Sequence, residues 1–186
     1  WQDRFARPLD LSVNISTQLF SRQEFVDQVA EAIHSHGLRH GSLRIEVTES
    51  ALLNNSDVVD DNFARLRELP ISIYLDDFGT GFSSLSYLHQ LMVETLKIDR
   101  SFVNRVGRGQ GGAEMLHAIV SLGHSLGMDV VAEGVETGEQ LTHLRALGCE
   151  YAQGFYYSAP VNAAAAERLV ERHPWAAPAL ESKLAS

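Results

Sequence analysis

The amino-acid sequence predicts an α/β protein built on a parallel sheet. Short apolar runs with strand-like alternation recur along the chain, and a helical pattern fills the gap between each pair of runs. A strand–helix–strand unit places its two strands parallel in one sheet, with a right-handed crossover. Because the strand–helix order repeats six times, we expect six parallel strands with helices packed against the sheet.

Six segments show the period-two alternation of β-strands. The expected strands cover residues 11–15, 43–47, 71–76, 95–98, 129–133 and 151–155. In the first of them, Leu11, Val13 and Ile15 share one face, whereas Ser12 and Asn14 share the other. The same alternation of apolar and polar faces is present in the strands that follow.

Start and stop signals mark the first two long helices. Ser21 and Glu24 have the spacing of a capping box, and the apolar stripe that follows ends at Gly37. Asp57 is expected to cap the next helix, which Pro70 closes.

Three more helices are predicted in the second half of the chain. One covers residues 113–126, and a second capping box, formed by Thr137 and Gln140, begins the next. The last helix begins at Asn162 and ends before Pro174.

Length and composition limit the possible classes of protein. With 186 residues, 45% of them hydrophobic, the chain is long enough for one domain over residues 1–173, and the Ala/Pro-rich residues 174–186 read as a tail or linker. The formal net charge of −9 argues against a nucleic-acid polymer as partner, although bound cations would allow a small anionic ligand. Cys149 is the only cysteine, so no intrachain disulfide is possible, and we expect a domain in the reducing cytoplasm. No apolar run approaches the length of a membrane span.

Polar residues fall at the carboxyl ends of the predicted strands, out of phase with their apolar neighbours. They are Asn14, Glu46, Asp76, Lys97, Glu133 and Gln153. An open doubly wound sheet and part of a (β/α)8 TIM-type barrel both fit the strand–helix order, but polar strand ends favour the barrel, whose catalytic face is built there. Because a complete barrel runs to about 250 residues, we expect roughly 60 residues on its N-terminal side to be missing from this chain.

The oxygen-rich residues among them predict a site for magnesium or manganese. Asp76 and Asp77 are adjacent carboxylates that suit a bridged pair of cations, with Asp77 just past the strand. Asn14 offers a neutral oxygen and Glu46 a carboxylate. The alternatives are a strand-to-helix turn capped by an aspartate, and an ion pair between Glu46 and Arg44 inside the barrel.

Four further side chains are candidates at the same edge. Lys97 lies between apolar strand residues, where it could hold or deprotonate a water beside metal-bound oxygens, although most lysines face solvent. Glu133 ends its strand with an inward carboxylate; the alternative is a capped turn. Gln153 could present its amide to a phosphate or base, and Glu49 could accept hydrogen bonds that fix a neighbouring loop.

Six ordered segments together resemble the EAL-domain family, bacterial phosphodiesterases that linearise cyclic di-GMP. The matching segments are SVNIS (12–16), RIEVTES (44–50), DDFGTG (76–81), LKIDRSFV (96–103), VAEGVET (131–137) and YAQGF (151–155). They occur in the order typical of the family and span nearly the whole chain as far as Pro160.

The resemblance implies a role for each matching residue. Ligands of a first cation would be Asn14, Glu46 and Asp76, and ligands of a second would be Asp76, Asp77 and Glu133. Lys97 would contact the attacking water, and Glu49 would steady the loop at 76–81. The residues near the metal-bound water or substrate would be Gly79, Thr80, Glu136 and Gln153.

The resemblance also implies two-metal hydrolysis of cyclic di-GMP to the linear 5′-phosphorylated dinucleotide. It implies a homodimer around the loop after Asp77, with sensory or signalling domains elsewhere in a full-length protein that a membrane anchor could tether.

The Glu-Ala-Leu motif that names the family lies upstream of the first matching segment, and this sequence begins after it. Ala159 stands where a basic residue is common. The alternatives are a catalytically silent receptor for cyclic di-GMP and a protein-interaction scaffold.

Overall fold

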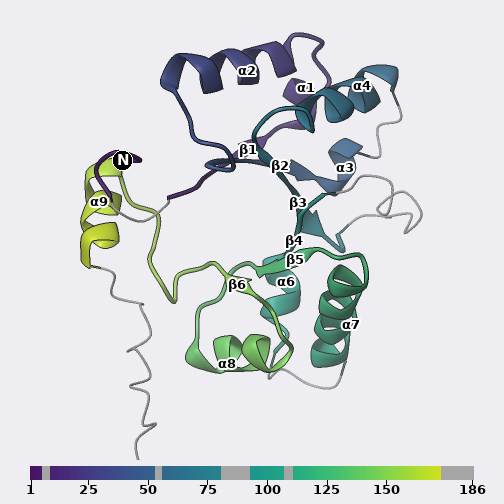
Figure 1. Ribbon diagram of the computed structural model, residues 1–186. Helices are drawn as coiled ribbons and strands as arrows, with labels where there is room; N and C mark the ends of the chain where they lie inside the picture. The colour runs from purple at the N-terminus through teal and green to yellow at the C-terminus, as the bar shows by residue number, and fades with distance from the viewer. Residues whose placement is uncertain (6–8, 53–55, 81–92, 107–110, 173–186) are drawn as a thin grey trace, which may run out of the picture.

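The fold is one parallel sheet of six strands whose spatial order follows the chain, β1-β2-β3-β4-β5-β6 (Figure 1). The computed structural model describes residues 1–5, 9–52, 56–80, 93–106 and 111–172. The strands are β1 Leu11–Ile15, β2 Leu43–Thr48, β3 Ser72–Phe78, β4 Thr95–Ile98, β5 Asp129–Ala132 and β6 Tyr151–Ala152. Sequential order is that of a (β/α)8 barrel, whereas a doubly wound sheet reverses its order at a switch point. The predicted fold class is therefore confirmed, as part of a barrel.

Helices follow the strands, and Figure 1 shows most of them along the outer side of the curved sheet. They are α1 Thr17–Phe20, α2 Phe25–His36, α3 Glu49–Leu52, α4 Asp57–Leu66, α6 Arg100–Val103, α7 Gly112–Ser125, α8 Gly138–Ala146 and α9 Ala163–Arg172. The sequence pattern does not predict α1, α3 and α6, because four residues are too few to show apolar periodicity. Across the described ranges, every helix is too short or too polar to cross a membrane.

The first predicted capping box is wrong. α2 begins at Phe25, and its N-cap residue Glu24 makes no side-chain cap bond. Ser21 instead ends α1, and its hydroxyl donates to the Thr17 carbonyl at 2.9 Å. The end of α2 agrees with the prediction, because Gly37 adopts the left-handed conformation with φ 57°.

The other two predicted caps have different outcomes. α4 is capped by Ser56, whose hydroxyl accepts from the Val59 amide at 3.3 Å, so Asp57 is the first helical residue and not the cap. The capping box before α8 is confirmed. Gln140 N–H donates to the Thr137 hydroxyl at 3.2 Å, and the Gln140 side chain accepts from Thr137 N–H at 3.0 Å.

The predicted strand at 151–155 is too long. β6 ends at Ala152, although Gln153 N–H still donates to the Ala132 carbonyl at 2.8 Å. The backbone of Gly154 then passes so close to Val135 that a Cβ at Gly154 would lie 2.3 Å from Val135 backbone atoms. The chain turns at this contact, and Tyr157 N–H donates to the Gly154 carbonyl.

The core lies between the outer face of the sheet and the helices. The apolar strand residues in it include Ile45, Val47, Leu75, Leu96, Ile98 and Val130, packed with Phe20, Leu66, Leu116 and Leu144 from the helices. Because strand side chains alternate, this packing leaves the intervening polar residues on the inner face. The burial of one face therefore decides which residues can form a site on the other.

Asn62 makes a polar connection inside this core that the sequence pattern does not reveal. Its side chain is fully buried in α4, and its amide donates to the carbonyls of Phe20 and Arg22, both at 2.8 Å. These carbonyls lie at the end of α1 and in the turn that leads to α2, so the amide ties this part of the chain to α4.

We expect Asn62→Ala to lower the free energy of unfolding by about 2–3 kcal/mol, because two carbonyls lose their donors. Asp61→Ala changes the neighbouring exposed position, whose contact with Arg65 at 3.9 Å is loose, and should stay within about 0.5 kcal/mol. Urea unfolding of both variants measures the difference. Equal losses would contradict the structural role given to Asn62.

Candidate active site at the carboxyl ends of the strands

The sheet register brings all of the predicted strand-end polar residues except Gln153 together on the inner face. Asn14 on β1 is the Cα partner of Glu46 on β2, and Thr48 on β2 is the partner of Asp76 on β3. Lys97 lies on β4, and Glu133 follows the last residue of β5. Glu46, Asp76 and Lys97 are buried, with exposed fractions of 5%, 7% and 2%.

Lys97 is at the centre of the group. Its Nζ lies 2.5 Å from Glu46 Oε2, 3.0 Å from Asp76 Oδ1 and 2.6 Å from Glu133 Oε1. One ammonium thus pairs with three carboxylates from three other strands or strand ends. The ammonium compensates part of their negative charge in a buried region, where an unpaired carboxylate would lower the stability of the fold.

The alternative ion pair between Glu46 and Arg44 is not formed. Arg44 pairs with Asp10 near the start of β1, and its guanidinium lies 5.2 Å from the centre of the Tyr74 ring. Arg44 and Glu46 are two residues apart on β2, and each has a partner of its own.

The charge balance of the group shifts several pKa values. Burial alone would lower the pKa of Lys97, but hydrogen bonds to Glu133 and Glu46 outweigh it and raise that pKa above its usual range. Lys97 is therefore a firmly protonated donor at neutral pH. Burial raises the pKa of Glu133 against the opposing effect of Lys97, and burial followed by the charge of Asp76 raises the pKa of Asp77. The carboxylates are crowded enough that a further cation would stabilise their charged forms.

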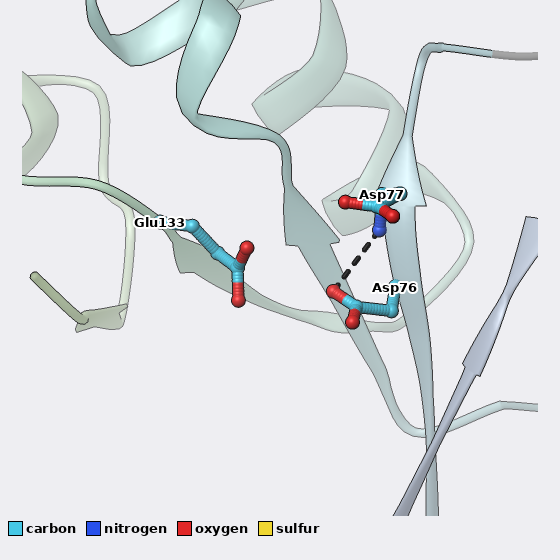
Figure 2. A group of neighbouring side chains, drawn as sticks. All are labelled: Asp76, Asp77 and Glu133. Carbon is cyan, nitrogen blue, oxygen red and sulfur yellow. Dashed lines mark hydrogen bonds between the residues drawn. The ribbon is translucent and has the colours of Figure 1, made fainter. Parts of the chain in front are cut away.

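A bulge lets two consecutive aspartates contribute to the same site. In a regular strand they would face opposite sides, but the pairing of β3 with β4 shifts between Leu75 and Phe78. Asp77 has φ 55°, and its N–H donates to Asp76 Oδ1 at 3.0 Å (Figure 2). The sequence predicts Asp77 just past the strand, but Asp77 lies inside β3, because the strand continues through the bulge to Phe78.

The carboxylates of Asp76, Asp77 and Glu133 form a possible metal-binding group. Each offers one oxygen, and the three oxygens lie within 4.8 Å of one another (Figure 2). The N–H groups of the Asn14 amide can donate to Glu46 Oε2 at 3.1 Å and to Asp76 Oδ2 at 3.0 Å. Turned over, it presents its oxygen to the same carboxylates, as a shared cation would require. Oxygen donors of this kind fit magnesium or manganese.

Glu49 and the loop after Asp77 lie beside this group. Glu49 begins α3 and is buried, and its Oε2 accepts from Gly79 N–H at 3.3 Å. The Thr80 hydroxyl donates to the Asp77 carbonyl at 2.8 Å. The loop backbone is therefore held on one side by Glu49 and closed by its own threonine.

Glu136 and Gln153 are exposed beyond the ends of β5 and β6. The Glu136 N–H donates to the Gln140 side chain at 2.7 Å, and among the described residues no contact joins either side chain to the carboxylate group. The structure thus gathers the predicted metal ligands, Lys97 and Glu49, with Gly79 and Thr80 in the loop beside them. Of the predicted substrate-binding residues, Glu136 and Gln153 lie at the rim.

A family model of the EAL domain matches residues 1–160. The chain belongs to the EAL-domain family. Among curated relatives, the cyclic di-GMP phosphodiesterase NbdA of Pseudomonas aeruginosa is 42% identical over 175 residues, which are 94% of this chain and 22% of that protein. The chain spans about a fifth of the length of the curated relatives it matches first.

Solved EAL structures share this fold. The PaMucR phosphodiesterase in its c-di-GMP complex is 39% identical, with TM-score 0.80 over 84% of this chain and 64% of that one. The manganese and cyclic di-GMP complex of Klebsiella pneumoniae BlrP1 is 30% identical, with TM-score 0.73 over 81% of this chain and 39% of that one.

We expect Lys97→Met to lower the free energy of unfolding by about 3–5 kcal/mol in metal-free buffer, because three carboxylates lose their shared cation. Arg65→Met is a matched control that breaks exposed ion pairs of Arg65 on α4 with Asp27 on α2 and Asp61 on α4, and it should cost less than about 1 kcal/mol. Urea unfolding with a chelator present measures both. If the two variants lose the same stability, Lys97 is not the centre of the group.

Proposed function

We propose that this EAL domain hydrolyses cyclic di-GMP to the linear 5′-phosphorylated dinucleotide, with two divalent cations, magnesium or manganese, as cofactors. Support comes from relatives named as cyclic di-GMP phosphodiesterases and from EAL structures with that nucleotide bound. The observation that carries the proposal is the convergence of Asp76, Asp77 and Glu133 beside Lys97.

The oxygen donors divide into two ligand sets that share Asp76. Asn14, Glu46 and Asp76 would hold a first cation, and Asp76, Asp77 and Glu133 a second. Bound there, the cations would acidify a water and stabilise the negative charge that develops on the phosphodiester. The raised pKa values of Asp77 and Glu133 support this assignment, because both groups gain from a neighbouring positive charge.

The protein's own residues keep the ligands in place and orient the reactants. Lys97 is protonated and can donate a hydrogen bond to the attacking water while it pairs with Glu46 and Glu133. Glu49 holds the Gly79 amide, and with it the turn that follows Asp77. At the rim, the exposed Gln153 amide would donate to a phosphate oxygen of the substrate. The water oxygen joins phosphorus, the bond to the 3′-oxygen breaks, and that oxygen takes a proton from the water.

The chain matches only about a fifth of the length of its curated relatives, and this supports a role as one domain of a longer protein. We propose that sensory or signalling domains accompany it, that it acts in the cytoplasm and that it pairs as a homodimer. The dimer is predicted around the loop after Asp77, and the part of that loop at 81–92 lies outside the described residues.

Hydrolysis can be tested on the complete gene product with cyclic di-GMP and Mn²⁺ or Mg²⁺. We expect Asp76→Asn to slow formation of the linear dinucleotide at least about 100-fold, because both ligand sets lose a carboxylate. Asp129→Asn makes the same charge change at the exposed start of β5, far from the carboxyl ends, and should leave the rate unchanged. Chromatography resolves the cyclic and linear forms.

Two results would contradict the proposal. Bound cyclic di-GMP without any linear product would favour the silent receptor, and product formation that survives both Asp76→Asn and a chelator would exclude the cation mechanism.

A further inference from the structure

We infer that the Phe102 ring is a positioning residue for the cation site: it supports the turn at Gly79 and so holds the Asp77 carboxylate toward Asp76 and Glu133. The inference rests on the proposed function, because it concerns the same ligands. It adds a side chain that touches no ligand atom and that acts through the backbone of the loop.

The conformation of Asp77 needs support from its surroundings. Among the described residues, Asp77 is the only non-glycine with a positive φ, at 55°. Aspartate tolerates this left-handed region better than most residues, but it still favours others. A residue held there persists only when neighbouring contacts fix it. If the turn relaxed, the Asp77 carboxylate would leave the group that Figure 2 shows.

The turn is supported by a contact between the Gly79 backbone and the Phe102 ring. Gly79 has φ 93°, and a Cβ built on it would lie 2.8 Å from both Cε2 and Cζ of Phe102. The backbone of the turn therefore rests directly on the edge of the ring. Ile119 contributes a looser contact, 3.6 Å from the same point.

Phe102 is itself held firmly. It lies in α6 with 8% of its surface exposed, and the Arg105 guanidinium lies 5.7 Å from the centre of its ring. α6 directly follows β4, and Asp99 caps it by accepting from Ser101 N–H at 2.9 Å. The ring and Lys97 thus belong to one continuous strand–helix unit, which sets the turn against the ammonium.

A role in packing alone makes a different prediction. Replacing any buried phenylalanine by leucine costs stability, so loss of stability cannot identify a positioning residue. Phe63 offers a matched control, because it is 6% exposed in the same core but lies on α4, with its ring 6.5 Å from that of Phe20. A positioning role requires that Phe102→Leu weaken cation binding by folded protein and that Phe63→Leu leave it unchanged.

The experiment titrates the complete gene product with Mn²⁺ and follows free Mn²⁺ by electron paramagnetic resonance, with circular dichroism confirming folding. Releasing the turn should raise the Mn²⁺ dissociation constant at least about fivefold in Phe102→Leu. Gly79→Ala, which presses on the same ring from the loop side and also strains the backbone at φ 93°, should weaken binding too. In the double variant the combined loss should be smaller than the sum of the two, because both substitutions act in part on one contact. Mn²⁺ binding that is lost in Asp76→Asn is the part of the binding that belongs to this site.

The outcomes separate the two claims. Unchanged affinity in Phe102→Leu, with normal binding by the unmodified protein, overturns the inference and leaves the proposed function intact. Equal weakening by Phe63→Leu also overturns it. If Phe102→Leu fails to fold, normal affinity in Gly79→Ala overturns it. Absence of Mn²⁺ binding by the unmodified protein overturns both the inference and the cation mechanism.

Discussion

The site depends on one buried ammonium that holds three carboxylates together. Lys97 contacts Glu46, Asp76 and Glu133 at 2.5–3.0 Å, and its charge compensates only part of theirs. One positive charge among three carboxylates leaves the region with net negative charge. Burial, together with the charges of the neighbouring carboxylates, raises the pKa of Glu133. Excess negative charge in a buried region is destabilising when no cation is bound. The same excess makes the region suitable for divalent cations.

The sheet creates this group because one of its faces packs against the helices and the other does not. Apolar side chains on the outer face pack with the helices, so the alternating polar side chains must point inward. Parallel strands then bring their carboxyl ends to one edge. The bulge in β3 adds what regular alternation cannot, a second aspartate directed to the same side. Core packing, strand register and one backbone irregularity together produce the ligand set.

Much of this arrangement could be predicted from the sequence, because it follows from short-range periodicity. Alternation identifies the six strands and places Glu46 and Lys97 on the inner face. The remaining features arise from tertiary contacts that no local pattern encodes. Ser21 has the spacing of a helix cap, yet a one-turn helix before it takes its hydroxyl. Asp77 lies at a bulge that only the pairing with β4 creates, and Phe102 contacts Gly79 across 23 positions of sequence.

The central claim is that cations bind where Lys97 gathers the strand-end carboxylates. The most direct test is a crystal structure of the complete gene product grown with Mn²⁺, with anomalous scattering used to locate the metal. The account predicts one Mn²⁺ among Asn14, Glu46 and Asp76 and a second among Asp76, Asp77 and Glu133, with Lys97 still paired to its carboxylates. Anomalous peaks elsewhere, with the Lys97 contacts intact and no metal beside Asp76, would contradict it.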